Sequence, residues 1–153
     1  MTQISFRLAR DEECKTLSDL MLNSKAHWDY DAEFIEACRA DLTITPEWLQ
    51  SNAGYVAERN GLVVGFFGIS LAGDTAHVEH FFVAHEAIGS GVGALMWAEY
   101  LRQARSRGAV RIEIEAEPFA EPFYKRMGAT TVGTAPSTVF AGRLLPLMEL
   151  KLG

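Results

Sequence analysis

The sequence predicts a mixed α+β domain in which about four helices flank a mostly antiparallel sheet of about six to seven strands with one parallel pair. Three observations support this class. Short alternating apolar runs before residue 84 indicate a strand meander, and helical spacing of apolar residues begins at residue 91. Another alternating run follows at 110–114, so the strand, helix and strand imply a right-handed parallel crossover.

The first part of the chain predicts one strand and two helices. Residues 4–8 alternate apolar and polar or small side chains as in a strand. Asp11 offers an N-cap to a following helix, and a second helix is expected over 31–39. Residues 40–53 indicate irregular structure with one helical turn after Pro46.

A meander of three strands should follow. The dipeptide Asn60-Gly61 is a strong hairpin signal, because both residues tolerate the positive φ of a type I′ turn. It separates a strand around 55–57 from a returning strand over 62–69. A second turn at 73–74 leads into a third strand over 76–83.

From Gly91 the spacing of apolar residues changes from alternation to helical periodicity. The helix that begins there should end at Gly108. A strand is expected at 110–114, and a short helix at 120–127. Two closing strands complete the sheet, near residues 130–134 and 144–152.

Composition restricts the class of protein. A chain of 153 residues with 48% apolar residues suits one domain, 1–153, with a sizeable core. The net charge is −6, and no cluster of Lys and Arg suggests nucleic-acid binding. A cationic small molecule is the easier partner.

The two cysteines, Cys14 and Cys38, have no spacing typical of a metal site, a redox pair or a disulfide framework. We therefore expect reduced thiols and no metal. No run approaches the length of a membrane helix, and the N-terminus does not resemble a signal peptide, so we expect a cytoplasmic protein that does not bind membranes. The oligomeric state stays open, with a homodimer among the options.

A glycine-rich segment, Ile88-Gly89-Ser90-Gly91-Val92-Gly93, lies between an expected strand and an expected helix. Residues without Cβ let a bulky anion approach the backbone, and the free N–H groups of the helix N-terminus favour a pyrophosphate. The alternative is a turn that uses glycine only for its conformational freedom. The pattern therefore predicts a pyrophosphate site at this loop and the helix N-terminus that follows it.

Two other known types of phosphate-binding loop fit this sequence less well. A Walker loop needs Gly-Lys-Ser/Thr, whereas Gly93 is followed by Ala94 and Leu95. A dinucleotide fingerprint opens a parallel sheet and is followed by an acidic residue. Glu113 and Glu115 lie at the right distance, but here the loop follows an antiparallel meander.

With its elements in this order, the chain resembles the GNAT superfamily of N-acetyltransferases over nearly its whole length. The resemblance is most specific over residues 78–128. Gly91 and Gly93 match the family's Gln/Arg-x-x-Gly-x-Gly loop, with Ile88 at its first position. Residues 123–129 are similar to the family's Tyr-Glu-Lys-Leu-Gly-Phe segment.

This resemblance implies a GNAT-like fold and acetyl-CoA as co-substrate. The backbone at Phe82 and Val83 should pair with the pantetheine arm like an added strand. By the same resemblance, the pyrophosphate should be held by Gly89, Ser90, Gly91, Val92, Gly93 and Ala94. Glu117 stands where relatives commonly have Asn, seven residues before the motif tyrosine.

The candidate catalytic residues are Glu79 and Tyr124. Amide formation from a thioester needs a neutral amine, so Glu79 is favoured as the base, with His80 on the opposite strand face unless a bulge intervenes. Tyr124 matches the family's tyrosine and would protonate the departing thiolate. The alternatives are an ordinary solvated carboxylate for Glu79 and a core tyrosine for Tyr124.

Trp28, Tyr30 and Asp31, with His80, are candidates for the acceptor pocket, because aromatic walls and a carboxylate suit an amine. Core packing of the aromatic residues and an N-cap at Asp31 would explain Trp28, Tyr30 and Asp31 almost as well. The sequence thus predicts acetyl transfer to a primary amine of a small molecule or peptide by direct attack in a ternary complex. The alternative is a non-catalytic acyl-CoA sensor.

Overall fold

The structure, a computed structural model, describes residues 3–153, and Met1 and Thr2 of the predicted 1–153 domain lie outside the described residues. Seven strands make one sheet. They are β1 (Ser5–Leu8), β2 (Ala53–Arg59), β3 (Leu62–Ala72), β4 (Thr75–Val83), β5 (Arg111–Glu115), β6 (Thr130–Pro136) and β7 (Leu144–Lys151).

Five α-helices connect these strands within residues 3–153. They are α1 (Cys14–Lys25), α2 (Ala32–Ala37), α3 (Pro46–Ser51), α4 (Val92–Ser106) and α5 (Glu121–Arg126). Short 3-10 helices occur at η1 (Asp11–Glu13), η2 (His85–Ala87) and η3 (Pro118–Ala120).

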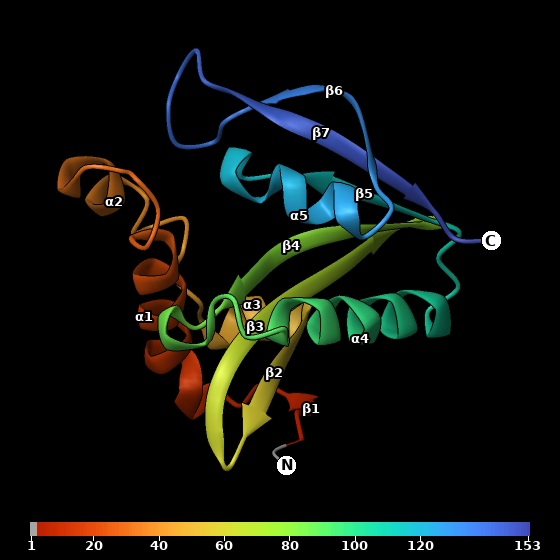
Figure 1. The fold of residues 1–153 in the computed structure, drawn as a ribbon. Helices are drawn as coiled ribbons and strands as arrows, with labels where there is room; N and C mark the ends of the chain where they lie inside the picture. Colours follow the sequence, from red (N-terminus) through yellow and green to blue (C-terminus); the bar gives the residue numbers. More distant parts are fainter. Residues whose placement is uncertain (1–2) are drawn as a thin grey trace.

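The sheet has the strand order β1-β2-β3-β4-β5-β7-β6 (Figure 1). Strands β4 and β5 run parallel, joined by α4, while the other neighbouring pairs within residues 3–153 are antiparallel. The predicted mixed fold and its single parallel crossover are therefore confirmed. The parallel pairing covers only Thr75–His77 of β4, and beyond it the two strands separate.

Two connections between the elements can be compared with what the local sequence predicted. The hairpin between β2 and β3 is confirmed, with Asn60 and Gly61 at φ values of 56° and 76°. The segment expected to be irregular forms the whole of α3, because Thr45 accepts a hydrogen bond from the Trp48 amide and Pro46 occupies the first turn. The helix is therefore about one turn longer than the single turn that the sequence predicted.

Two apolar clusters pack on opposite faces of the sheet. Tyr55 and Phe67 belong to one cluster, which contains the buried side of α4, whereas Val56 and Phe66 belong to the other, which contains α1. Neighbouring strand residues separate in this way because successive side chains point to opposite faces. The sheet is therefore covered on both sides along β2, β3 and β4.

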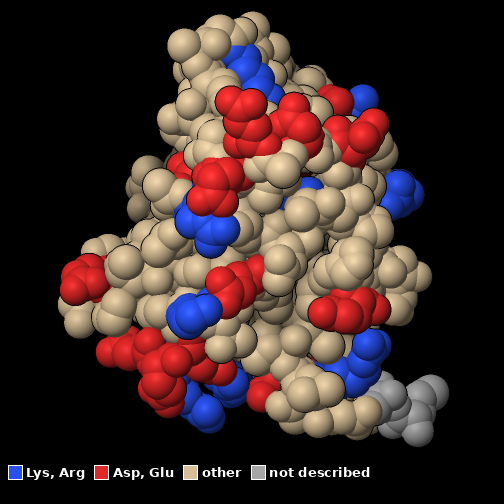
Figure 2. All heavy atoms as spheres, turned by 90° about the vertical axis from the view of Figure 1, so that its left-hand side faces the viewer, with Lys and Arg blue, Asp and Glu red and all other residues tan. Residues whose placement is uncertain are grey.

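The surface carries charges of both signs. On the face where α1 and α2 lie, Figure 2 shows Lys and Arg interspersed with Asp and Glu, without a continuous basic patch. Nucleic-acid binding usually needs such a patch. No helix within residues 3–153 combines the length and the apolar character needed to cross a membrane.

Candidate active site

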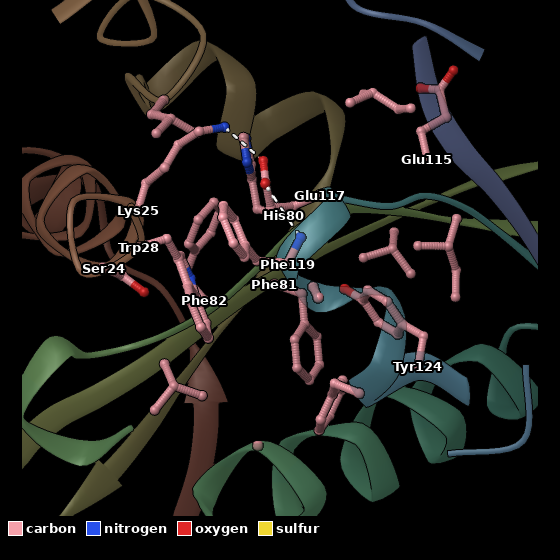
Figure 3. Close-up of a pocket in the computed structure, with 18 of the residues that line it drawn as sticks. Ser24, Lys25, Trp28, His80, Phe81, Phe82, Glu115, Glu117, Phe119 and Tyr124 are labelled. Atoms are coloured by element: carbon pink, nitrogen blue, oxygen red, sulfur yellow. Dashed lines mark hydrogen bonds and ion pairs between the residues drawn. The ribbon is translucent and has the colours of Figure 1, made fainter. Parts of the chain in front are cut away.

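A cavity of about 660 Å³ lies in the split between β4 and β5. Its walls come from β4, the glycine loop, η3 with α5, the end of α1 and the loop before β7 (Figure 3). Strands that diverge leave backbone groups without a neighbour. Residues 78–83 of β4 have no strand partner on the β5 side among the described residues, and all of them line the cavity.

The glycine loop presents free amides at one end of this cavity. Gly91, the residue before α4, has a φ of 87° and gives the helix no side-chain cap. Among the described residues, no backbone acceptor bonds the amides of Gly89, Gly91, Val92, Gly93 and Ala94. The Ser90 amide differs, because it donates to the Ala87 carbonyl at 3.2 Å. Five of the six expected anion-binding amides are therefore free.

At Gly93 the absence of a side chain serves helix packing. A Cβ built there would lie 3.2 Å from Cε1 of Phe123, so its absence lets α4 approach α5 closely. Gly89, Gly91, Gly93 and Ala94 line the cavity, whereas Ser90 and Val92 do not.

A β-bulge in β4 brings two candidate bases to the same face. Gly68 pairs with His80 and Ile69 pairs with Val78, so Glu79 has no partner on β3. A Cβ on Gly68 would lie 3.3 Å from that of Glu79, and the His80 and Trp48 rings are 5.3 Å apart. Both candidates consequently line the cavity, as the sequence allowed only with a bulge.

The two candidate bases, Glu79 and His80, have different surroundings. Glu79 is exposed, and its carboxylate accepts a hydrogen bond from Ser70 Oγ at 2.7 Å. His80 packs among the rings of Trp48, Phe66 and Phe82. Burial lowers the pKa of His80, although the charges of Asp41 and Glu79 oppose the shift. His80 is therefore neutral at pH 7 and able to accept a proton.

Tyr124 lies on the other side of the split. It is 5% exposed and packs against Trp97 and Phe81, yet its hydroxyl has no hydrogen-bond partner among the described residues. Figure 3 shows this hydroxyl pointing into the cavity. Burial raises the pKa of Tyr124, so the hydroxyl keeps its proton throughout the neutral range.

The three acceptor candidates of the α1–α2 connection take different positions. Trp28 lines the cavity and stacks on Phe119, with ring centroids 5.3 Å apart. Tyr30 lies behind this wall and donates a hydrogen bond to Glu117. Asp31 caps α2 by accepting from the Phe34 amide at 2.8 Å, and it does not line the cavity.

Glu117 organises a cluster that the sequence did not identify. Lys25 Nζ lies 3.3 Å from Glu117 Oε2, and Arg143 Nη2 lies 3.7 Å from the same atom. Arg143 also donates to the Tyr30 hydroxyl at 3.0 Å. Burial and the bond to Glu117 raise the pKa of Tyr30. A carboxylate at the position of the family's Asn was the available signal, but its partners come from distant segments.

No group of three or more His, Cys, Asp and Glu side chains within the described part of the chain could hold a metal ion. The residues do suit an elongated anionic thioester. Free amides stand at one end of the cavity, an unpaired strand edge runs along it, and Glu79, His80 and Tyr124 line the split.

Comparison with solved structures finds the same fold in N-acetyltransferases. A GCN5-related N-acetyltransferase from Rhodopseudomonas palustris superposes with a TM-score of 0.82 at 21% identity, over 99% of this chain and 98% of that chain. The PaiA N-acetyltransferase of Thermoplasma acidophilum, in complex with coenzyme A, gives 0.81 at 18% identity, over 97% and 99%. The ribosomal-protein-S18-alanine N-acetyltransferase of Escherichia coli gives 0.71 at 12% identity, over 98% and 94%.

Comparison with curated protein sequences gives no significant match. The family model for the acetyltransferase (GNAT) domain, however, matches residues 15–152, which include every element that lines the cavity. Family membership supports an acyltransferase activity. The chain belongs to the GNAT acetyltransferase family.

Proposed function

We propose that this protein transfers the acetyl group of acetyl-CoA to a primary amine of a small molecule or peptide, by direct attack within a ternary complex. One observation carries the proposal. A single cavity joins the free amides of the glycine loop to Glu79, His80 and Tyr124. Anion binding and proton transfer can therefore act on one bound thioester.

The loop and the strand edge would hold acetyl-CoA. The five free amides, at Gly89 and 91–94, favour the pyrophosphate together with the positive end of the α4 dipole. Phe82 and Val83 would offer backbone groups to the pantetheine arm on the open edge of β4. Ile88 adds no side-chain hydrogen bond, so anion binding depends on the backbone.

Acetyl-CoA supplies an activated acyl thioester. The acceptor arrives as an ammonium with a pKa of about 10.4, and Glu79 or the neutral His80 takes its proton. The amine nitrogen then bonds to the carbonyl carbon while the carbon–sulfur bond breaks. Tyr124 donates its proton to the departing sulfur, and the nitrogen returns its surplus proton to the Tyr124 oxygen, so the products are a neutral amide and a free thiol. Burial disfavours a lasting phenolate at Tyr124.

Replacing Tyr124 by Phe tests this role. The exchange should lower kcat by about 10²-fold, because the departing thiolate loses its proton donor. Release of free thiol from acetyl-CoA in the presence of a panel of amines measures the rate. Tyr100→Phe is a matched control, because Tyr100 is an equally buried tyrosine of the same core that does not line the cavity.

An unchanged rate in Tyr124→Phe would remove this residue from the mechanism. Tight acetyl-CoA binding by calorimetry without thiol release for any amine would support the acyl-CoA sensor instead. The proposal includes one acyl-CoA-binding domain over residues 1–153 and a cytoplasmic location, which the free thiols of Cys14 and Cys38 suit.

A further inference from the structure

Two cationic side chains and a serine line the cavity, and we call these residues, Lys25, Ser137 and Arg143, the cationic wall. Lys25 is the last residue of α1. Ser137 and Arg143 lie at the two ends of the loop between β6 and β7, where the Ser137 amide donates to the Arg143 carbonyl at 2.8 Å. The side chains of Lys25 and Arg143 are only 14% and 24% exposed.

One carboxylate serves both cations of the wall (Figure 3). Glu117 Oε2 lies 3.3 Å from Lys25 Nζ and 3.7 Å from Arg143 Nη2. The Tyr30 hydroxyl, which donates to the other oxygen of Glu117, adds no charge because burial raises its pKa. No other ion pair within residues 3–153 involves either cation. One positive charge is therefore left without an ion-pair partner, which is costly in a largely buried site unless an anion binds there.

The cationic wall also has hydrogen-bond donors to spare. Among the described residues, only Nη2 of the Arg143 guanidinium donates a hydrogen bond, to the Tyr30 hydroxyl at 3.0 Å. The guanidinium lies over the Phe34 ring, 5.0 Å from its centroid, and this contact uses none of its N–H groups. Ser137 Oγ accepts from two amides of its own loop, at 3.1 and 3.2 Å, so its proton remains to be donated. Free donors beside a cation suit a carboxylate, which the arginine fork binds with two parallel bonds.

The proposed base lies elsewhere in the same cavity and carries the opposite charge. Glu79 on β4 accepts a hydrogen bond from Ser70 and takes part in no ion pair within residues 3–153. Asp41 also lines the cavity, where it accepts a hydrogen bond from Thr138 at 3.2 Å and pairs with neither cation of the wall. A molecule with an ammonium at one end and a negative group at the other matches this separation of charge.

We infer that the acceptor is a small zwitterion, an amine that carries a carboxylate as an amino acid does. The carboxylate binds the cationic wall, and the nitrogen beside Glu79 receives the acetyl group. This inference rests on the proposed acetyl transfer and names its substrate class. The N-terminus of a peptide has no α-carboxylate beside its amine, so it lacks the group that the wall would bind.

Acceptors that differ only in the carboxylate test the inference. Thiol release at saturating acetyl-CoA is measured with a panel of L-amino acids and with the amine that each would give on losing its carboxylate. L-leucine with isopentylamine and L-phenylalanine with phenethylamine are two such pairs. For the amino acid that reacts fastest, kcat/KM should be at least about tenfold higher than for its amine, because charge-assisted bonds form at the cationic wall.

Variants locate the source of this preference. In Arg143→Gln the ratio of the two kcat/KM values should fall about tenfold, whereas Arg143→Lys keeps the charge and should retain part of it. Arg105→Gln, at an exposed position near the end of α4, removes the same charge elsewhere and should keep the ratio. Because each ratio compares two acceptors on one protein, it does not depend on the fraction of the variant that is folded.

Each outcome separates the two proposals. Amino acids that react no faster than their amines across the panel would overturn the zwitterion inference and leave acetyl transfer standing. A ratio that is unchanged in both Arg143→Gln and Lys25→Gln would also overturn it. No thiol release with any amino acid or amine would contradict the proposed function itself.

Discussion

The imidazole of His80 lies beside the rings of Trp48 and Phe66, on the sheet face that α1 and α3 cover. In this position a positive charge would lose its hydration, which is why burial lowers the pKa of His80. A histidine held neutral can accept a proton, but it also makes folding depend on pH.

The sign of this dependence follows from the direction of the shift. Below about pH 6.5 the unfolded chain protonates its histidine while the folded protein resists, so the free energy of unfolding falls as the pH falls. We expect urea denaturation from pH 7 to pH 5 to show this loss, and His80→Gln to reduce its slope. An identical slope in the variant would show that His80 does not titrate differently on folding.

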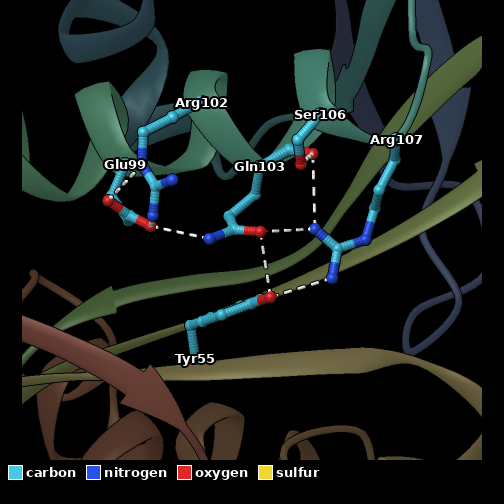
Figure 4. A network of polar contacts seen from close by, with 6 residues as sticks. All are labelled: Tyr55, Glu99, Arg102, Gln103, Ser106 and Arg107. Atoms are coloured by element: carbon cyan, nitrogen blue, oxygen red, sulfur yellow. Dashed lines mark hydrogen bonds and ion pairs between the residues drawn. The ribbon is translucent and has the colours of Figure 1, made fainter.

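Among the elements, α4 begins at the glycine loop, and its C-terminal part contacts β2. Near its C-terminal end, the Tyr55 hydroxyl of β2 donates to Gln103 Oε1 at 2.9 Å and accepts from Arg107 Nη2 at 2.8 Å (Figure 4). Gln103 in turn donates to Glu99 at 2.7 Å. The network fixes the helix against β2, and a fixed helix holds its N-terminal amides in place for an anion.

Gly91 and Gly108 give a matched pair at the two ends of α4. Both have positive φ, 87° and 84°, and neither has a neighbour within 4 Å of an added Cβ. Alanine at either position should therefore cost about 1–2 kcal/mol of stability from backbone strain alone. Only Gly91→Ala should weaken acetyl-CoA binding, by about tenfold, because its loop lines the cavity. Calorimetry that finds equal losses of affinity would contradict the anion site.

The Glu117 cluster joins three separate elements. It connects Lys25 at the end of α1, Tyr30 before α2 and Arg143 before β7, all through the carboxylate of Glu117, the residue that precedes η3. The side chains of Lys25 and Glu117 are only 14% and 19% exposed. Two cations would lose their partner if this carboxylate were removed, and buried charges without partners are costly.

Glu117→Gln should consequently lower the free energy of unfolding by about 1–3 kcal/mol. The matched control is Asp19→Asn, which removes an exposed ion pair with Lys15 and should change stability very little. Urea denaturation measures both variants. Equal stability of the two variants would mean that the cluster contributes no more than a surface pair.

At the scale of the whole molecule, the split between β4 and β5 divides the sheet into the part β1-β2-β3-β4 and the part β5-β7-β6. Strands β2, β3 and β4 are covered by apolar clusters on both faces. The cavity lies beyond His77, where β4 is no longer paired with β5. A thioester bound along this edge would contact both parts, so binding should stabilise the folded protein as a whole.

Acetyl-CoA at 100 times its Kd should raise the free energy of unfolding by about 2.7 kcal/mol. The corresponding increase in Tm is about 5–10 °C for a protein of this size. ATP and NAD lack the pantetheine arm and should give much smaller shifts. Thermal denaturation at matched ligand concentrations tests this, and equal shifts for all three would favour a general nucleotide site.

The sequence by itself determined the strands, the crossover and the glycine loop, because each depends on preferences that act within a few residues. Alternation predicted β4, the dipeptide at 60–61 predicted a hairpin, and three glycines before a helix predicted the free amides. The Ser90 amide was the exception, because its bond to Ala87 depends on the turn that η2 imposes.

Only the tertiary structure decided which side chains meet. The bulge at Glu79 depends on the register against Gly68, and neither strand encodes that register alone. Glu117 lies beside Lys25 and Arg143, and Asp41 lines the same small hollow as Glu113, because packing brings separate segments of the chain together. Contacts between distant residues arise from the summed burial of both cores, so local sequence patterns do not specify them.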